Sequence, residues 1–275
     1  MSKYQIILVI VGIALIGWLY SLPKVVVKSN KQPESAKAPQ ASSSSHSSAD
    51  SLKNIDFSEE ASSKISDFRT QFNAASDKTT KIRIADSIAT VFKENRSFDS
   101  AAYYKKIIAQ LSPDKTNLEN AGDAFADAAN FSAEMDKVRA NSEEARRYYE
   151  QILQSAPDDL NVKSKIAMTY ISSENPMAGI TMLREVVQKD PNNELAIFNL
   201  GILSLQSKQN DKAVERFEKL VDLNPNHWKG RFYLGIAYNE LGKKKKAREQ
   251  FELVKKLEQD PEVVQTVDNY LEEIR

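Results

Sequence analysis

The sequence contains no cysteine, and its 275 residues include only two histidines, eight glycines and nine prolines. Without cysteine the chain can form no disulfide, thiol nucleophile or thiolate metal site. Two histidines, His46 and His227, leave almost no material for a histidine-based metal site or general base. The composition also excludes a fibrous or turn-rich β class. We therefore expect no enzyme, no bound metal and no cofactor.

An excess of charge of one sign is missing as well. Lysine plus arginine and aspartate plus glutamate number 38 each, so the formal net charge is zero and no overall field attracts nucleic acid. The one local cluster, residues 243–246, consists of lysines without interleaved aromatic rings or arginines. We interpret it as a solvated turn, and phosphate contact in RNA or anionic lipid is the alternative. No nucleic-acid partner is expected.

What the sequence does contain is a repeat: the stretch from Pro191 to Pro261 copies itself at a step of 34 residues. Among the residues that recur at this step are Pro191 as Pro225, Leu200 as Leu234, Gly201 as Gly235, Ala213 as Ala247 and Phe217 as Phe251. Within a unit, apolar residues form two stripes of helical period, separated by the polar run 207–211. Each unit is predicted to form two antiparallel helices that cross at small residues, with Asn210 or Asp211 capping the second.

This pattern resembles the tetratricopeptide repeat family, whose signature is a hydrophobic, Leu-Gly, Tyr, Ala, Phe, Pro series. The unit from Glu194 matches at Leu200, Gly201, Ala213, Phe217 and Pro225, and the unit from Trp228 matches at Leu234, Gly235, Tyr238, Ala247 and Phe251. The first unit departs at Ile197, where the family often has Trp, and at Ser204, where it often has Tyr. The second has Arg231 at its first position, and its proline comes two residues late.

The resemblance implies an all-α fold, a right-handed α-solenoid within residues 57–275. Weaker copies precede the two clear units, so about five TPR-like helical hairpins are expected, at residues 79–113, 115–157, 160–191, 194–225 and 228–259. An amphipathic stripe of Ile65, Phe68 and Phe72 lies before the first hairpin. A C-terminal capping helix at residues 261–275 is expected to give the array the polar outer cover that terminal repeats need.

The second hairpin is longer than the others, because its proline-to-proline step is 44 residues instead of 34. The alanine-rich extra segment, Ala126 to Ala140, predicts about three added helical turns split across the hairpin. Asn141 and Glu144 resemble a capping box that opens its second helix. In the third hairpin, Asn175 and Pro176 predict a cap followed by proline at the first helical position.

Residues 1–23 are predicted to form one transmembrane helix that precedes the solenoid. No charged residue occurs from Tyr4 to Pro23, and about 20 residues suffice to cross the hydrocarbon core. Trp18 and Tyr20 lie near its end, where aromatic rings favour the interface. A cleaved signal peptide is the alternative, but the positive segment is very short and no small-x-small site follows. We expect an uncleaved anchor that contacts the membrane through residues 4–22.

Residues 24–56 are rich in serine, lysine and proline, and they predict a flexible linker. Only Lys3 precedes the span, whereas four lysines follow it closely, namely Lys24, Lys28, Lys31 and Lys37. The excess of positive charge after the span favours a cytoplasmic repeat domain on an inner or cell membrane. Short amino tails make exceptions to this rule common, so a periplasmic repeat domain is the alternative.

In the tetratricopeptide family the first helix of each hairpin lines the concave side. The resemblance places on that side Leu195, Phe198, Ile202 and Leu205 of the fourth unit and Lys229, Phe232, Ile236 and Asn239 of the fifth. Chaperone-binding members carry Lys and Asn there as a carboxylate clamp; Asn199 matches one Asn, but Phe198 and Phe232 stand where Lys is needed. We therefore predict an apolar groove that binds an amphipathic helix or an extended apolar segment.

The leading hypothesis is a membrane-anchored scaffold or adaptor that mediates protein–protein interaction through this groove. One alternative is a structural accessory subunit of an envelope or secretion assembly, without a free ligand. Another is that the terminal helix or the second hairpin fills the groove. If the groove is open, Phe198→Glu with Phe232→Glu should abolish partner capture and leave the melting temperature nearly unchanged. A large loss of stability would mean that the two rings belong to the core.

Overall fold

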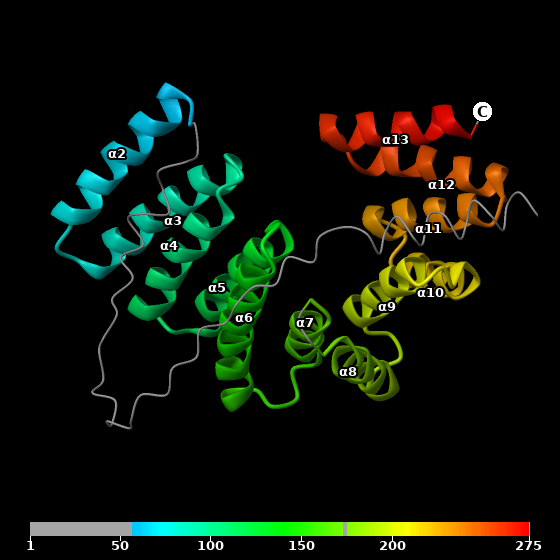
Figure 1. The fold of residues 1–275 in the computed structure, drawn as a ribbon, viewed down its shortest axis with the longest axis horizontal. Helices are drawn as coiled ribbons and strands as arrows, with labels where there is room; N and C mark the ends of the chain where they lie inside the picture. The colour runs from blue at the N-terminus through cyan, green and yellow to red at the C-terminus, as the bar shows by residue number, and fades with distance from the viewer. Residues whose placement is uncertain (1–56, 173–174, 275) are drawn as a thin grey trace, which may run out of the picture. The chain divides into compact units, whose positions relative to one another are not determined.

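The computed structural model describes residues 57–172 and 175–274, which belong to the unit Ala49–Arg275. These residues form twelve α-helices and no strand (Figure 1). The helices are α2 (Glu59–Ala74), α3 (Lys78–Glu94), α4 (Phe98–Leu111), α5 (Lys115–Asn130), α6 (Met135–Ser155), α7 (Leu160–Ile171), α8 (Pro176–Lys189), α9 (Glu194–Gln206), α10 (Asn210–Leu223), α11 (Trp228–Glu240), α12 (Lys244–Leu257) and α13 (Pro261–Glu273). None of them is long and apolar enough to cross a membrane. The predicted anchor and linker, residues 1–56, lie outside the described residues.

Ten helices pair into five hairpins, α3 with α4, α5 with α6, α7 with α8, α9 with α10 and α11 with α12. We number them hairpins 1 to 5. The second helix of each hairpin also packs on the first helix of the next, so that neighbouring hairpins stack (Figure 1). Single helices close the series, since α2 packs on α3 and α13 packs on α12. The predicted all-helical, TPR-like array is therefore confirmed for the part of the chain that the structure describes.

Glycine at the helix crossing allows the close approach within hairpins 4 and 5. A Cβ atom on Gly201 would lie 2.6 Å from the ring of Phe217, and one on Gly235 would lie 2.7 Å from the ring of Phe251. Both phenylalanines are completely buried. Any larger residue at these glycines would displace the ring, because interiors are close-packed. In each hairpin the repeated glycine and phenylalanine therefore pack directly against each other, and the helices cross at a small residue as predicted.

Of two expected helix starts, the one at Asn175 is confirmed and the one at Asn141 is wrong. Asn175 caps α8 by accepting a hydrogen bond from the Ala178 N–H at 3.3 Å, with proline at the first helical position as predicted. The expected capping box of the second hairpin is wrong, because α6 already begins at Met135. Asn141 lies inside this helix, and its side-chain amide donates to Asp99 Oδ1 of the preceding hairpin at 2.9 Å. The side chain of Asn141 therefore makes a hydrogen bond to another helix in place of the local capping bond that was predicted.

The expected cap of α10 is also wrong. Asn210 is the first residue of the helix, and the N-cap is Gln209, whose side chain makes no capping bond. Lys208 before it has a φ of 56°, and Gln209 N–H donates to the Ser204 carbonyl at 2.8 Å. This closing bond of a left-handed helix end fixes where the next helix starts. The hairpin turn therefore sets the start of α10, and Asp211 lies within the helix.

Candidate protein-binding surface

All eight side chains predicted to bind a partner lie on the first helices of hairpins 4 and 5. We call them the first-helix surface: Leu195, Phe198, Asn199, Ile202 and Leu205 on α9, and Phe232, Ile236 and Asn239 on α11. Seven of them are partly exposed, whereas Asn199 is buried with 8% of its surface exposed. The two helices contact each other directly. The structure thus brings the predicted residues together on adjacent elements.

Phe198 takes part in the packing between hairpins 4 and 5. Its ring centroid lies 6.0 Å from that of Phe217 in its own hairpin. In the next hairpin it lies 5.6 Å from the ring of Tyr233 and 5.5 Å from the ring of His227. Edge-to-face pairs at such distances are favourable. Much of this ring is therefore engaged within the protein.

Phe232 repeats this arrangement one hairpin later. Its centroid lies 5.9 Å from Phe251 in its own hairpin, 5.4 Å from its neighbour Tyr233 and 5.6 Å from Tyr270 on α13. The terminal helix thus covers Phe232 as α11 covers Phe198. The terminal helix reaches this end of the first-helix surface with at least one aromatic ring.

The aliphatic members of the first-helix surface are more accessible to a ligand than the two phenylalanines, because they are not engaged in ring contacts. Ile202, Leu205 and Ile236 pack against the core of hairpins 4 and 5 and stay partly exposed, without a ring partner. Lys229 at the start of α11 is exposed, and its Nζ lies 5.4 Å from the ring centroid of Trp228. These positions offer a line of aliphatic side chains with a cation at one end.

His227 is the N-cap of α11, a role that the sequence did not reveal. Its Nδ1 accepts a hydrogen bond from the Gly230 N–H at 2.9 Å. The repeat offered a signal for the cap, because Asn193 and Asp159, at successive steps of 34 residues, cap α9 and α7 in the same way.

The first helices of hairpins 2 and 3 carry charge in place of apolar side chains. Lys165 on α7 donates to both carboxylate oxygens of Asp123 on α5 and lies equally close to Glu119, at 2.7 Å in each case. The Tyr149 hydroxyl donates to Asp123 Oδ1 at 2.7 Å. We call these four residues the ionic cluster. Sequence reasoning missed it, because its members are 16 to 46 residues apart along the chain except for Glu119 and Asp123.

The protonation states of the ionic cluster follow from burial and from its hydrogen bonds. Burial lowers the pKa of Lys165, but the bonds to the two carboxylates outweigh it and raise the pKa overall. Burial, and then the charge of Asp123, raise the pKa of Tyr149 far above its usual range. The lysine is therefore charged and the phenol neutral at neutral pH.

The lysine cluster at residues 243–246 surrounds the start of α12. All four side chains are exposed, and the Nζ atom of Lys246 lies 5.1 Å from the ring centroid of Tyr238. The solvated position of the lysines agrees with the interpretation as a surface turn.

Within residues 57–172 and 175–274, no three acidic or histidine side chains are grouped so that they could hold a metal ion.

Comparison with known proteins adds a family match over part of the chain. The family model described as tetratricopeptide repeat matches residues 204–267. Among solved structures, the chain is similar to YrrB, described as a TPR protein with an unusual peptide-binding site, with 16% identity and a TM-score of 0.40 over 68% of this chain and 91% of that one. It is also similar to MamA 41-end from Desulfovibrio magneticus RS-1, with 22% identity and a TM-score of 0.41 over 68% and 98% of the two chains. A search of curated proteins found no match. The family model thus supports a tetratricopeptide repeat assignment for residues 204–267.

Proposed function

We propose that this protein is a membrane-anchored scaffold, without catalytic activity of its own, that binds a protein partner on the first-helix surface. The partner segment is an amphipathic helix or an extended apolar stretch. The observation that carries the proposal is the line of partly exposed aliphatic side chains on α9 and α11, namely Leu195, Ile202, Leu205 and Ile236. Apolar side chains along adjacent helices suit an apolar peptide face.

The anchor and its orientation belong to the same proposal. The uncharged stretch within residues 4–22 is long enough to span a bilayer, and the lysines that follow it favour a cytoplasmic repeat domain. The protein should therefore fractionate with membranes, resist carbonate extraction and retain its first residues. A mature terminus near Lys24 would contradict an uncleaved anchor. Protection of the serines at 42–48 from protease in spheroplasts would support the cytoplasmic side.

Partner capture tests the first-helix surface. Ile202→Asp with Ile236→Asp places two charges on this surface outside the aromatic contacts. A matched control is Leu223→Asp with Leu257→Asp, since these leucines are exposed and also 34 residues apart. Crosslinking and mass spectrometry on the full-length membrane protein should lose the captured partner for the isoleucine pair only.

Equal capture by both variants, with unchanged helicity, would overturn the assignment of the surface. Loss of capture by both variants would overturn it too, because the effect would then be independent of position. Thermal unfolding of each variant shows whether a loss reflects unfolding, and an isoleucine variant that unfolds is replaced by Ile236→Asn alone.

A second candidate is a structural accessory subunit of an envelope or secretion assembly. The observation that favours it is an exposed apolar tip on the long second hairpin. Phe131 stacks on Phe98 with centroids 4.1 Å apart, yet 64% of its surface is exposed, and Met135 is 71% exposed. The fragment from Leu52 to Arg275 distinguishes the two functions. A soluble monomer supports the scaffold, whereas a fragment that is insoluble without a partner supports the subunit.

A further inference from the structure

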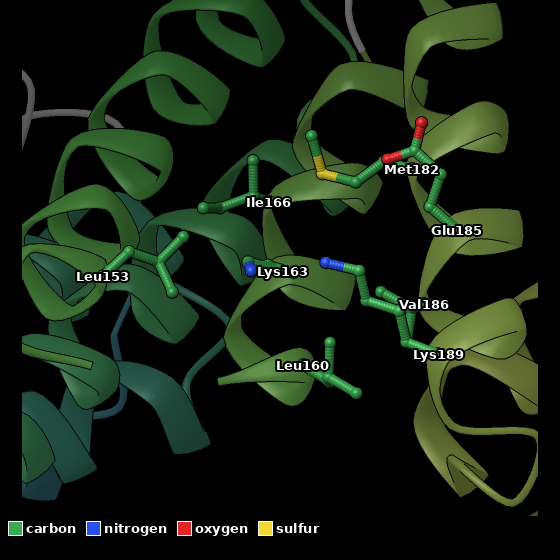
Figure 2. A pocket seen from close by; sticks show the side chains of 8 residues that line it. All are labelled: Leu153, Leu160, Lys163, Ile166, Met182, Glu185, Val186 and Lys189. Atoms are coloured by element: carbon green, nitrogen blue, oxygen red, sulfur yellow. The ribbon is translucent and has the colours of Figure 1, made fainter. Parts of the chain in front are cut away.

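A small pocket lies where α7 is flanked by α6 and α8, away from the first-helix surface. Its volume is about 220 Å³. Five apolar side chains line it, which are Leu153 of α6, Leu160 and Ile166 of α7, and Met182 and Val186 of α8 (Figure 2). None of these residues belongs to the first-helix surface. The pocket is therefore a separate feature of hairpin 3 and the end of α6.

Two lysines bring positive charge to this apolar pocket. Figure 2 shows the Lys189 side chain reaching from α8 across the pocket toward α7, where Lys163 lies. Lys163 is only 25% exposed, and its nearest acid is the fully solvated Asp158 at 3.9 Å, a distance that gives a weak pair. Among the described residues Lys189 has no ion pair. With Glu185 as the only acid in the lining, the pocket carries a net positive charge.

The pocket continues into an open hollow along α8. Met182 and Glu185 line both, and the hollow extends from them past Ala178 to Asn175 and Met177. Met177 is 61% exposed, so its apolar side chain is accessible in this hollow. The two depressions together give one face of α8 the length to hold an extended segment, with a deeper pocket at one end.

The size of the pocket limits what can occupy it. Pockets for small molecules usually measure roughly 300 to 1,000 Å³, and this one falls below that range. A single bulky side chain is of suitable size, and such anchors in small pockets dominate many protein interfaces. The lysines at the pocket complement acidic neighbours of that side chain, which would fix its orientation and speed the encounter.

We propose that this pocket is a second docking site, for a protein segment in which one bulky apolar side chain is flanked by acidic residues. The apolar side chain enters the space between Leu153, Ile166 and Met182. The flanking carboxylates pair with Lys163 and Lys189, and the rest of the segment follows α8 toward Met177. This site goes beyond the function proposed above, since it shares no residue with the first-helix surface.

The test uses labelled peptides in which a central leucine is flanked by glutamates, with fluorescence anisotropy on the full-length chain. Lys163→Glu with Lys189→Glu should weaken binding by roughly tenfold or more, and Met182→Trp should weaken it by filling the pocket. Lys244→Glu with Lys245→Glu is the matched control, because it changes two exposed lysines on α12 and should leave binding unchanged. Ile202→Asp with Ile236→Asp should also leave it unchanged, which separates this site from the first-helix surface.

Four results would overturn the proposal. They are no binding of the leucine peptide, equal binding of a peptide with central alanine, an equal effect of the control lysine pair, and displacement of the peptide by decanoate at matched concentration. The last result would assign the pocket to an acyl chain. Circular dichroism melting of each variant shows that binding is compared between folded proteins.

Discussion

Hairpins 2 and 3 join their first helices by charge, whereas hairpins 4 and 5 join theirs by aromatic rings. Glu119 and Lys165 meet at 2.7 Å between α5 and α7. Phe198 and Tyr233 meet with ring centroids 5.6 Å apart between α9 and α11. These two pairs look unrelated in the sequence, and the contacts they make differ in chemistry, distance and directionality.

The repeat register shows that the two contacts are equivalent. Glu119 and Phe198 each lie three residues before the crossing glycine of their helix. Lys165 and Tyr233 each lie two residues before the small residue that takes this place in the next hairpin. The Nζ atom of Lys165 lies 5.9 Å from the ring centroid of Tyr149, the ring that Gly122 faces in hairpin 2. In the same way, Tyr233 stacks at 5.9 Å on Phe217, the ring that Gly201 faces in hairpin 4.

This equivalence shows that the hairpin geometry determines which positions come into contact. The residues at those positions then determine whether the contact is ionic or aromatic. An ionic contact needs good geometry to offset the loss of hydration, and here the lysine has two carboxylates. An aromatic contact is less directional and gains stability from buried area. The protein thus carries a charged first-helix face in one half of the array and an apolar one in the other.

The largest expected effect is on the aromatic side. Phe198→Glu with Phe232→Glu should destabilise the protein by roughly 2 kcal/mol for each ring, because each loses apolar burial and places a carboxylate among aromatic neighbours. Thermal and urea unfolding measure the change. A melting temperature close to that of the wild type would show instead that both rings are free for a ligand, as an open groove requires.

A smaller effect is expected when the ionic contact is broken and then converted. Lys165→Met should cost about 1 to 2 kcal/mol, because it leaves two neighbouring carboxylates without a cation. Glu119→Phe with Lys165→Tyr installs the ring pair of the other half, and should recover at least part of this loss through a favourable coupling between the two positions. Urea unfolding of both single variants and the double variant gives the coupling. Strict additivity would argue that the two contacts are not equivalent.

Alkaline pH should weaken the ionic side through Tyr149. Its pKa is raised in the folded protein from the ordinary value of 10.0. A group with a raised folded-state pKa stabilises fully below its unfolded pKa, and this contribution is lost as pH rises. Between pH 7 and about pH 10.5, Tyr149→Phe should therefore lose about 1 kcal/mol less stability than the wild type. Denaturant unfolding at both pH values checks this, and parallel losses would contradict the assigned shift.

The smallest effect concerns the helix start beside the aromatic contact. His227→Ala removes the cap of α11 and should cost about 1 kcal/mol. His227→Asn restores the capping oxygen that Asn193 supplies one repeat earlier, and should recover most of that loss. Thermal unfolding of the two variants measures the difference. Equal stability of the two would mean that the imidazole stabilises through its contact with Phe198 and not through the cap.

Much of the fold could be predicted from the sequence, because the repeat combines helical period with small residues at a fixed spacing. Gly201 with Phe217 and Gly235 with Phe251 marked the crossings that the structure shows. The same register placed the residues predicted to bind a partner on the first helices of hairpins 4 and 5, where the structure has them. Their accessibility could not be predicted, because the exposure of Phe198 depends on rings that lie on other helices.

The sequence by itself determined the helical hairpins, their order and the glycine crossings, since these depend on local period and on contacts within one repeat. The tertiary structure alone decided the partner of Asn141 within α6 and the ionic cluster around Lys165. It also decided that Phe232 meets Tyr270 of the terminal helix. The physical reason is the same in each case: the partner lies in another helix, and only the stacking of hairpins brings it within reach of a hydrogen bond or a ring contact.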